Sequence, residues 1–196
     1  MKWNYCLFNL LENLQRFLFG EPREKAKQTP HFLPKTIFFR SIPVERDIHY
    51  IWKNEARTLL VDDGRTLTLS GTLQRALVKK TLKTWIAQQA RNYFTVELNK
   101  ISQDTKLHYS NLRFKNTKTR WGSCSDKKNI NLNIQLLFLP KHLSHQVLLH
   151  ELCHLVHLNH SKSFWNLLAT FEPNYKKLER ELRHEGRKYI PGWMLQ

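Results

Sequence analysis

Apolar residues recur along the chain with two different spacings, which predict alternating groups of strands and helices. Short runs with alternating apolar and polar positions predict strands at residues 36–42, 48–52, 58–61, 65–69, 111–115 and 129–133. Asp62, Asp63 and Gly64 predict a hairpin turn between the third and fourth of these strands. A long helical pattern covers residues 73–101, and helical spacing returns after Pro140 at about residues 143–158, 162–170 and 175–189. This order is typical of an α+β domain rather than a doubly wound sheet.

The first 35 residues have a different pattern. An amphipathic helix is predicted by apolar residues on one helical face, namely Leu7, Leu10, Leu11, Leu14, Phe17 and Leu18. Prolines among charged residues at positions 21–34 predict a linker after it. Polar residues interrupt the apolar positions, which argues against a secretory signal or a membrane span of about 20 residues. We therefore expect residues 1–35 to be an extension and residues 36–196 to form one domain.

The composition bears on whether the chain can form a core and on the compartment in which we expect the protein. Hydrophobic residues make up 41% of the chain and aromatic residues 12%, which is enough for a buried core. The three cysteines, Cys6, Cys124 and Cys153, form no CxxC pair. Such an odd, sparse set argues against a disulfide scaffold and suits a reducing compartment, so we expect a cytoplasmic protein.

The formal net charge of +16 bears on partners rather than on fold. Between Thr72 and Arg120 the chain carries eleven Lys and Arg residues against two acids, Glu97 and Asp104. A local excess of this size attracts polyanions such as nucleic acid. The alternative is that these cations are simply solvated, so proximity to nucleic acid stays open as a second partner prediction.

The chemistry of the sequence is concentrated in the run His150-Glu151-Leu152-Cys153-His154. Two histidines four residues apart on a helix project from the same face, so both imidazoles can reach one Zn²⁺ ion. Glu151 lies beside that face, where its carboxylate can accept a proton from water activated by the metal. The surrounding residues are apolar, as in a buried active-site helix.

A catalytic zinc usually has three protein ligands, and two histidines compete for the third position. On an unbroken helix His157 would point the same way as His150. If the chain instead turns after about Val156, His160 can swing back; Asn159 tolerates the backbone of such a turn, and Ser161 can cap the next helix. Because a straight helix would hold His157 beyond easy reach of the ion, geometry favours His160.

These segments resemble the YgjP-like metallopeptidase family, within a wider group that includes the WLM and SprT-type zinc proteases. The resemblance is carried by residues 150–165 (HELCHLVHLNHSKSFW), by residues 119–125 and 129–133 (TRWGSCS and NINLN), and by Pro173-Asn174-Tyr175. It extends from about Thr36 to the C-terminus. Asn129 departs from it, since family members often carry glycine shortly after the RWGSCS block.

The resemblance implies a zincin-like α+β domain with a small antiparallel sheet and an active-site HExxH helix. It also implies a third histidine beyond a turn, which corresponds by spacing to His160, and an aromatic pair soon after it, Phe164-Trp165. His157 would then belong to the wall of the site. Glu172 and Glu179 remain as alternative third ligands, as in other zincins.

The predicted function is zinc-dependent hydrolysis of peptide bonds, with His150, His154 and His160 as metal ligands and Glu151 as general base. One alternative keeps the site but changes the substrate to a nucleotide phosphoanhydride, although no Gly-rich phosphate loop is evident. Another is a basic nucleic-acid-associated protein with structural zinc, which would have no need of Glu151. For Arg120 and Trp121 a structural pairing and a place in the substrate cleft both stay open, whereas Cys124 and Cys153 are interpreted as packing residues.

Overall fold

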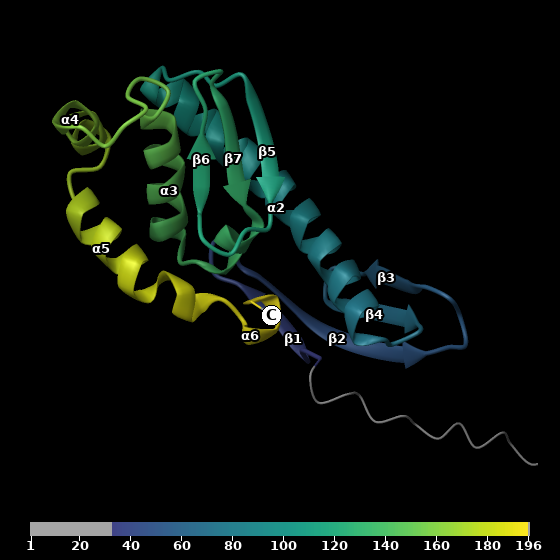
Figure 1. The fold of residues 1–196 in the computed structure, drawn as a ribbon. Helices are drawn as coiled ribbons and strands as arrows, with labels where there is room; N and C mark the ends of the chain where they lie inside the picture. Colours follow the sequence, from purple (N-terminus) through teal and green to yellow (C-terminus); the bar gives the residue numbers. More distant parts are fainter. Residues whose placement is uncertain (1–32, 196) are drawn as a thin grey trace, which may run out of the picture. The chain divides into compact units, whose positions relative to one another are not determined.

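The chain divides into two units, Met1–His31 and Phe32–Gln196. The computed structural model describes residues 33–195, which lie in the second unit. The amphipathic helix predicted within residues 1–20, and nearly all of the predicted linker, lie outside the described residues. Figure 1 shows two small sheets, one long helix that runs along both, and a group of helices at the C-terminal end.

The strands form two mixed sheets. The first has the order β1-β2-β4-β3 and the second the order β5-β7-β6. Their bounds are β1 (Thr36–Phe39), β2 (Val44–Trp52), β3 (Thr58–Asp62), β4 (Thr66–Gly71), β5 (Asn111–Lys115), β6 (Gly122–Cys124) and β7 (Asn129–Asn133). The α+β class is confirmed, but the sheet differs from the small antiparallel one expected, because β2 pairs with β4 and β5 with β7 in parallel. Alternating apolar positions fix which face of a strand is buried and leave the direction of its neighbour open.

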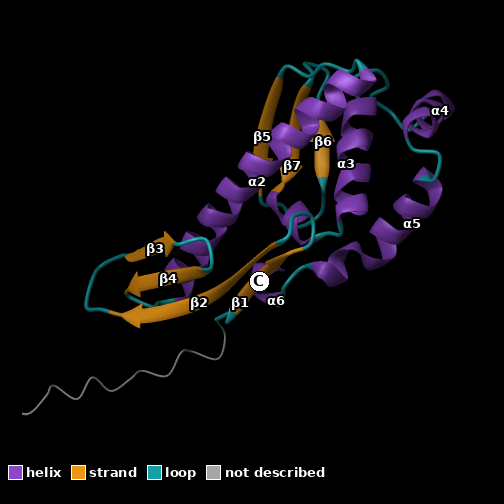
Figure 2. Ribbon diagram, turned by 180° about the vertical axis from the view of Figure 1, so that it is seen from behind, coloured by secondary structure: helices purple, strands orange, loops and turns teal. Residues whose placement is uncertain are grey.

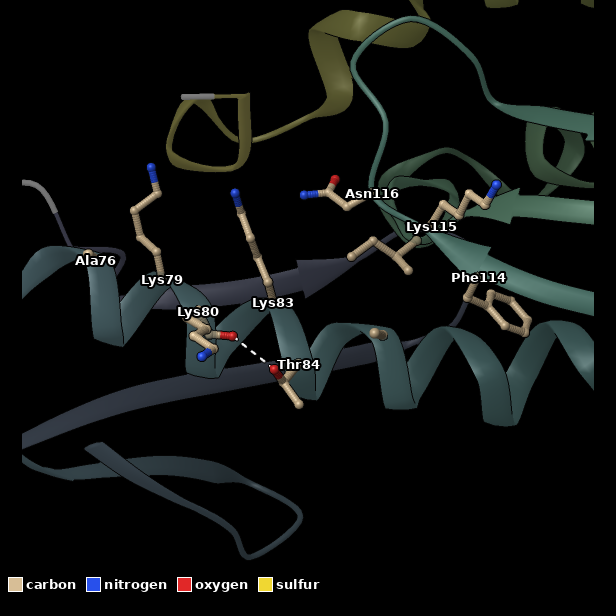
Figure 3. Close-up of a pocket in the computed structure, with 10 residues that line it drawn as sticks. Ala76, Lys79, Lys80, Lys83, Thr84, Phe114, Lys115 and Asn116 are labelled. Carbon is tan, nitrogen blue, oxygen red and sulfur yellow. Dashed lines mark hydrogen bonds between the residues drawn. The ribbon is translucent and has the colours of Figure 1, made fainter. Parts of the chain in front are cut away.

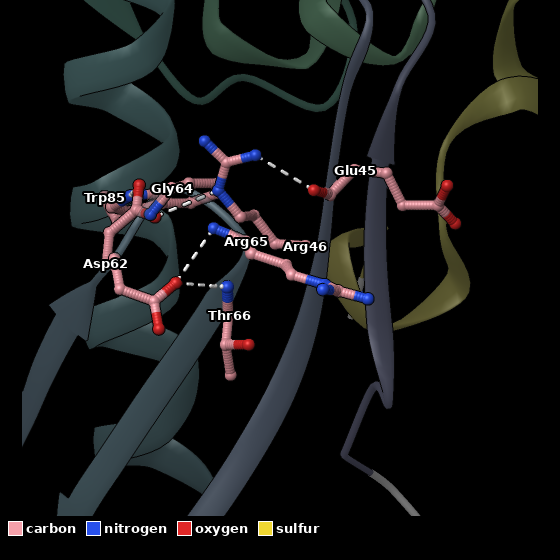
Figure 4. Close-up of polar contacts among 8 residues, drawn as sticks. Glu45, Arg46, Asp62, Gly64, Arg65, Thr66 and Trp85 are labelled. Carbon is pink, nitrogen blue, oxygen red and sulfur yellow. Dashed lines mark hydrogen bonds and ion pairs between the residues drawn. The ribbon is translucent and has the colours of Figure 1, made fainter.

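The predicted hairpin turn joins β3 to β4, which pair antiparallel. Gly64 has a φ of 91°, a left-handed conformation that glycine adopts without strain. Asp63 Oδ1 accepts hydrogen bonds from the backbone N–H groups of Arg65 and Thr66. Asp62 accepts hydrogen bonds from Arg46 Nε of β2 at 2.9 Å and from the indole of Trp85 at 3.1 Å (Figure 4). One carboxylate therefore ties the turn to the neighbouring strand and to the long helix.

The long helix α2 (Arg75–Thr105) contributes to the core at both sheets. It packs against β3 near its N-terminal end and against β5 farther along (Figure 2). Its buried residues follow the helical period and are Val78, Leu82, Trp85, Ile86, Ala90, Phe94, Leu98 and Ile101. The helix predicted at residues 73–101 is thus confirmed, four residues longer at its C-terminal end.

The remaining helices follow the second sheet. They are the short 3-10 helix η1 (Ile134–Phe138), α3 (Lys141–Cys153), α4 (Lys162–Phe171), α5 (Tyr175–Glu185), the 3-10 helix η2 (Gly186–Tyr189) and α6 (Gly192–Leu195). Helix α3 packs against β6 on one side and against α4 and α5 on the other, as Figures 1 and 2 both show. It ends at Cys153, five residues before the end predicted from its apolar pattern. Within residues 33–195 no helix has the length and apolar character that a membrane crossing requires.

Phe39 joins three parts of this core. Its ring, at the end of β1, stacks on Trp85 of α2 at 5.5 Å and meets Phe138 of η1 edge-on at 5.3 Å. The side chain is fully buried. The first sheet, the long helix and the segment that leads into α3 therefore share one aromatic cluster.

We expect Phe39→Ala to lower the free energy of unfolding by about 3–5 kcal/mol, the usual cost of deleting a buried phenylalanine ring. The matched control is Phe38→Ala, because Phe38 is the next residue of the same strand and is 47% exposed. Urea denaturation followed by circular dichroism measures both. Equal losses for the two variants would contradict the role assigned to Phe39.

Candidate metal centre

Helix α3 presents two imidazoles at its C-terminal end. His150 and His154 are one turn apart, and their Nε2 atoms lie 3.2 Å from each other. Most of the helix between and before them is buried, including Leu148, Leu149 and Leu152. The apolar faces fix the rotation of α3 against the sheet, and this rotation directs both histidines to the same side.

A tight turn brings the third histidine back to the first two. The backbone leaves the helix after Cys153, where the N–H groups of Val156 and His157 both donate to the carbonyl of Cys153. His160 then lies with its Nε2 3.0 Å from Nε2 of His150. Ligand atoms of His150, His154 and His160 all lie within 4.8 Å of one another. The imidazole of His157 does not belong to this group.

Hydrogen bonds to the other ring nitrogens orient two of these imidazoles. His154 Nδ1 lies 2.9 Å from the backbone carbonyl of His157, and since a carbonyl only accepts, this nitrogen carries the proton. His150 Nδ1 lies 3.1 Å from Oε1 of Glu179 on α5 and donates to that carboxylate. Both Nε2 atoms are therefore the unprotonated nitrogens that a metal ion requires.

Charges around the three histidines favour this protonation pattern. Burial lowers the pKa of His154 and of His160, and the neighbouring His150 lowers both further. Burial raises the pKa of Glu179, but hydrogen bonds from His150 and Gln146 outweigh it and hold that pKa below its usual value. These pKa shifts favour the neutral form of His154 and His160 and the ionised form of Glu179.

Glu151 lies next to the histidines in a confined position. It is 5% exposed, and burial raises the pKa of its carboxyl group to about 7, against the opposing influence of His150. Its Oε2 atom has no hydrogen-bond partner among the described residues. Glu151 lines a cavity of about 210 Å³ together with His150, Glu179, Arg120, Trp121 and Gly122. One oxygen of a buried carboxylate is therefore left to act on a molecule in this cavity.

The backbone of β6 closes one side of Glu151. A Cβ atom added at Gly122 would lie 2.5 Å from Oε1 and 2.7 Å from Cγ of Glu151, closer than real carbon atoms approach. Only glycine leaves room for the carboxylate there. No strand was predicted within residues 119–125, and Gly122 was given no role; the RWGSCS block was the signal that this segment matters.

Other residues singled out from the sequence lie around the site without joining the histidine group. Trp121 packs under the guanidinium of Arg187 at 4.2 Å. Oε1 of Glu172 accepts from the backbone N–H of Asn174 before α5. Burial raises the pKa of Cys124 to about 11 and that of Cys153 to about 12, so both are thiols that pack rather than react. Sequence reasoning named Glu179 as an alternative metal ligand, whereas the structure places it behind His150.

A larger cavity lies elsewhere, along α2. It has a volume of about 580 Å³, and four of the residues that line it are lysines, Lys79, Lys80, Lys83 and Lys115. Lys79 and Lys83 extend from the same side of the helix (Figure 3). Among the described residues that line this cavity there is no histidine, cysteine or acid. Four of the eleven cations in the basic segment of residues 72–120 thus lie here, away from the three histidines.

We expect His160→Ala to weaken metal binding more than His157→Ala. Removal of one of three converging nitrogens should cost more than the roughly 10–100-fold that loss of an outer hydrogen-bond partner costs. His157→Ala keeps the backbone carbonyl that His154 uses, so its affinity should stay near the wild-type value. Zinc titration against a chromogenic chelator measures both, and a greater loss in His157→Ala would reverse the assignment.

Comparisons with known proteins relate this chain to metallopeptidases. A family model described as YgjP-like, metallopeptidase domain, matches residues 11–185. The metallopeptidase zymogen abylysin of Pyrococcus abyssi matches with 24% identity over 45% of this chain and 91% of its own, at a TM-score of 0.40. Jannalysin of Methanocaldococcus jannaschii, also a metallopeptidase zymogen, matches with 26% identity over 47% and 93%, at a TM-score of 0.40. Comparison with curated proteins gave no match. Since the family model covers most of its length, the chain belongs to the YgjP-like metallopeptidase family.

Proposed function

We propose that this protein is a zinc-dependent peptidase in which His150, His154 and His160 hold the metal and Glu151 is the general base. The observation that carries the proposal is the convergence of three imidazole nitrogens beside a buried carboxylate with one unpartnered oxygen. Family membership supplies the substrate class, a peptide or protein. Neither the arrangement of the histidines and Glu151 nor the family match depends on the charge of the remainder of the chain.

The donor set suits zinc. Imidazole nitrogens are common zinc ligands, and three protein ligands leave one coordination position open, as catalytic sites do and structural sites do not. Glu179 behind His150 is the carboxylate–histidine arrangement that fixes a metal-binding imidazole and makes it a stronger donor. When bound, Zn²⁺ supplies Lewis acidity, which makes water a usable nucleophile near neutral pH.

In this mechanism Glu151 accepts a proton and later donates it. Its carboxylate accepts a proton from the attacking water as the oxygen bonds to the peptide carbonyl carbon. The same group donates this proton to the amide nitrogen as the carbon–nitrogen bond breaks. The bare backbone of Gly122 leaves room for the carboxylate. Burial raises the pKa of Glu151 to about 7, and the positive charge of Arg120 opposes this rise.

The lysine-lined cavity on α2 supports proximity to an anionic partner as a second property. Its lysines come from two separate elements, α2 and β5, and would attract phosphate groups. This cavity has no residue in common with the one at Glu151. We therefore treat nucleic-acid binding as independent of the hydrolytic site. Nucleotide phosphoanhydrides remain the alternative substrate to test at the hydrolytic site.

Glu151→Gln should keep its zinc and lose about 10²–10⁴-fold in kcat on peptide substrates, the usual contribution of a general base. The matched control is Glu172→Gln, which alters a glutamate outside the histidine group and keeps an oxygen that can accept from Asn174. Cleavage of a peptide library is followed by mass spectrometry, with nucleoside triphosphates assayed in parallel. Full activity in a zinc-loaded Glu151→Gln sample would refute the mechanism, and hydrolysis of triphosphates alone would replace the substrate.

Gly122→Ala tests the placement of the base without removing it. The added methyl group would displace the Glu151 side chain, so we expect kcat to fall by about 10²-fold, as when a catalytic group is misplaced by roughly 1 Å. Zinc content should not change. Gly192→Ala is the control, because a Cβ atom there meets nothing within 4 Å. Wild-type kcat in a folded Gly122→Ala variant would show that the close approach has no functional weight.

A further inference from the structure

A second cavity adjoins the metal centre on the side of α4 and α5. It has a volume of about 480 Å³ and is lined by Trp165, Tyr175, Glu179 and four basic residues, Lys176, Arg180, Arg183 and His184. Glu179 also lines the cavity that contains Glu151. Since Glu179 bonds His150 and Trp165 stacks on His160, this larger cavity begins one side chain away from two of the three histidines.

One wall of this second cavity is a row of stacked rings. Trp165 lies over His160 at 5.4 Å with an angle of 27° between the rings. Tyr175 lies over Trp165 at 5.5 Å with an angle of 15°. The three rings form a nearly parallel series from the histidine group to the start of α5. Such a wall gives an extended peptide an apolar surface that leads away from the metal centre.

The rim of the same cavity is polar and positively charged, because basic side chains of α5 line it. Lys176, Arg180 and Arg183 recur at spacings of four and three residues, so they lie on one face of the helix. All three are exposed. The acids of α5 are already engaged: Glu179 with His150, Glu181 with His142 and Glu185 with Lys188. Within residues 33–195 none of the three cations forms an ion pair. The rim of the cavity therefore carries positive charge that the described part of the protein does not neutralise.

We propose that this cavity selects peptide substrates by a carboxylate that binds Arg180 and Arg183. The inference rests on the peptidase function proposed above and names the substrate feature which the site recognises. The carboxylate belongs either to an Asp or Glu side chain near the scissile bond or to the C-terminus of the peptide. Arginine suits this role because its planar guanidinium binds a carboxylate through two parallel hydrogen bonds.

Binding of fluorescent peptides to zinc-loaded Glu151→Gln protein tests the proposal without hydrolysis. Three peptides differ only in carrying Asp, Ala or Lys at one position, each with a free or an amidated C-terminus. The Asp peptide or the free C-terminus should bind more tightly, by about fivefold for each arginine engaged, the upper value for an exposed ion pair. The preference should weaken at high salt. The amidated series distinguishes the two sources of the carboxylate.

Charge reversal identifies the residues. In Arg180→Glu/Arg183→Glu the ranking should invert, in favour of the Lys peptide for a side-chain carboxylate or of the amidated C-terminus for a terminal one. In Arg180→Gln/Arg183→Gln the ranking should disappear. The control is Lys177→Glu, which makes the same charge change on an exposed residue of α5 that does not line the cavity. It should leave the ranking unaltered. Both arginines are exposed, and thermal unfolding verifies that the variants fold.

The outcomes separate the two proposals. Equal affinity for all peptides, or an unchanged ranking in both arginine variants, would overturn the carboxylate site even if wild-type protein cleaves peptides. A ranking that changes as expected, while zinc-loaded wild-type protein cleaves none of the peptides, would uphold the binding site and defeat the peptidase mechanism. A cavity that binds a nucleoside triphosphate through these arginines, but does not distinguish Asp from Ala peptides or free from amidated C-termini, would overturn the assignment to peptides.

Discussion

Helix α3 has to bury apolar side chains on most of its surface while it keeps two imidazoles available at its C-terminal end. The positions of the neighbouring elements follow from this constraint. The second sheet covers the side of the helix that faces β6, and α4 and α5 cover the other. The burial of Leu148, Leu149 and Leu152 fixes the rotation of the helix. Because that rotation is fixed, His150 and His154 point to one place, and β6, the turn after α3 and α5 each bring a residue to the same place.

Three of these contributions come from outside α3, and two of them, from β6 and α5, come from far along the chain. Strand β6 supplies the bare backbone of Gly122 against Glu151, the turn after α3 supplies His160, and α5 supplies Glu179 behind His150. The arrangement places ligand atoms of the three imidazoles within 4.8 Å of one another, with the carboxylates of Glu151 and Glu179 beside them. The same packing that stabilises the fold therefore brings together a donor set that could hold a divalent cation.

The local part of the site could be predicted from sequence and the distant part could not. His150 and His154 follow from the periodicity of one helix. Placing His160 beside them needed a turn, which Asn159 and Ser161 signalled. The bond between His150 and Glu179 joins residues 29 positions apart, and no spacing encodes such a contact. Strand β6 has only three residues, too few for the alternation that reveals longer strands. The parallel strand pairs of the two mixed sheets could not be predicted for a related reason, because strand direction depends on pairing between residues far apart in the sequence.

The early end of α3 shows how a polar contact overrides an apolar pattern. Leu155 and Val156 continue the hydrophobic spacing and predict a helix to about residue 158, yet Val156 is 52% exposed. The helix ends at Cys153, and the carbonyl of His157 can then turn back to accept the hydrogen bond of His154 Nδ1. In a continuing helix that carbonyl would be directed along the axis, away from the ring. Leu158, at the predicted end of the helix, is 59% exposed as well. Exposure of these two side chains accompanies a paired donor on a buried histidine, which would be costly to leave unpaired.

The distribution of charge follows from the same arrangement. In a chain with an excess of sixteen positive charges, two of the few acids are used inside the site, Glu151 beside the histidines and Glu179 behind them. Two further acids of α5 are paired with His142 and Lys188. The carboxylates thus face inward or are neutralised, and the cations of α5 are left on the rim nearest the histidines. Under physiological salt such charges act over only about 8 Å, so they bear on the part of a substrate closest to the bond that is cut. The basic surface and the buried acids of the site therefore both follow from where the few carboxylates of this region are placed.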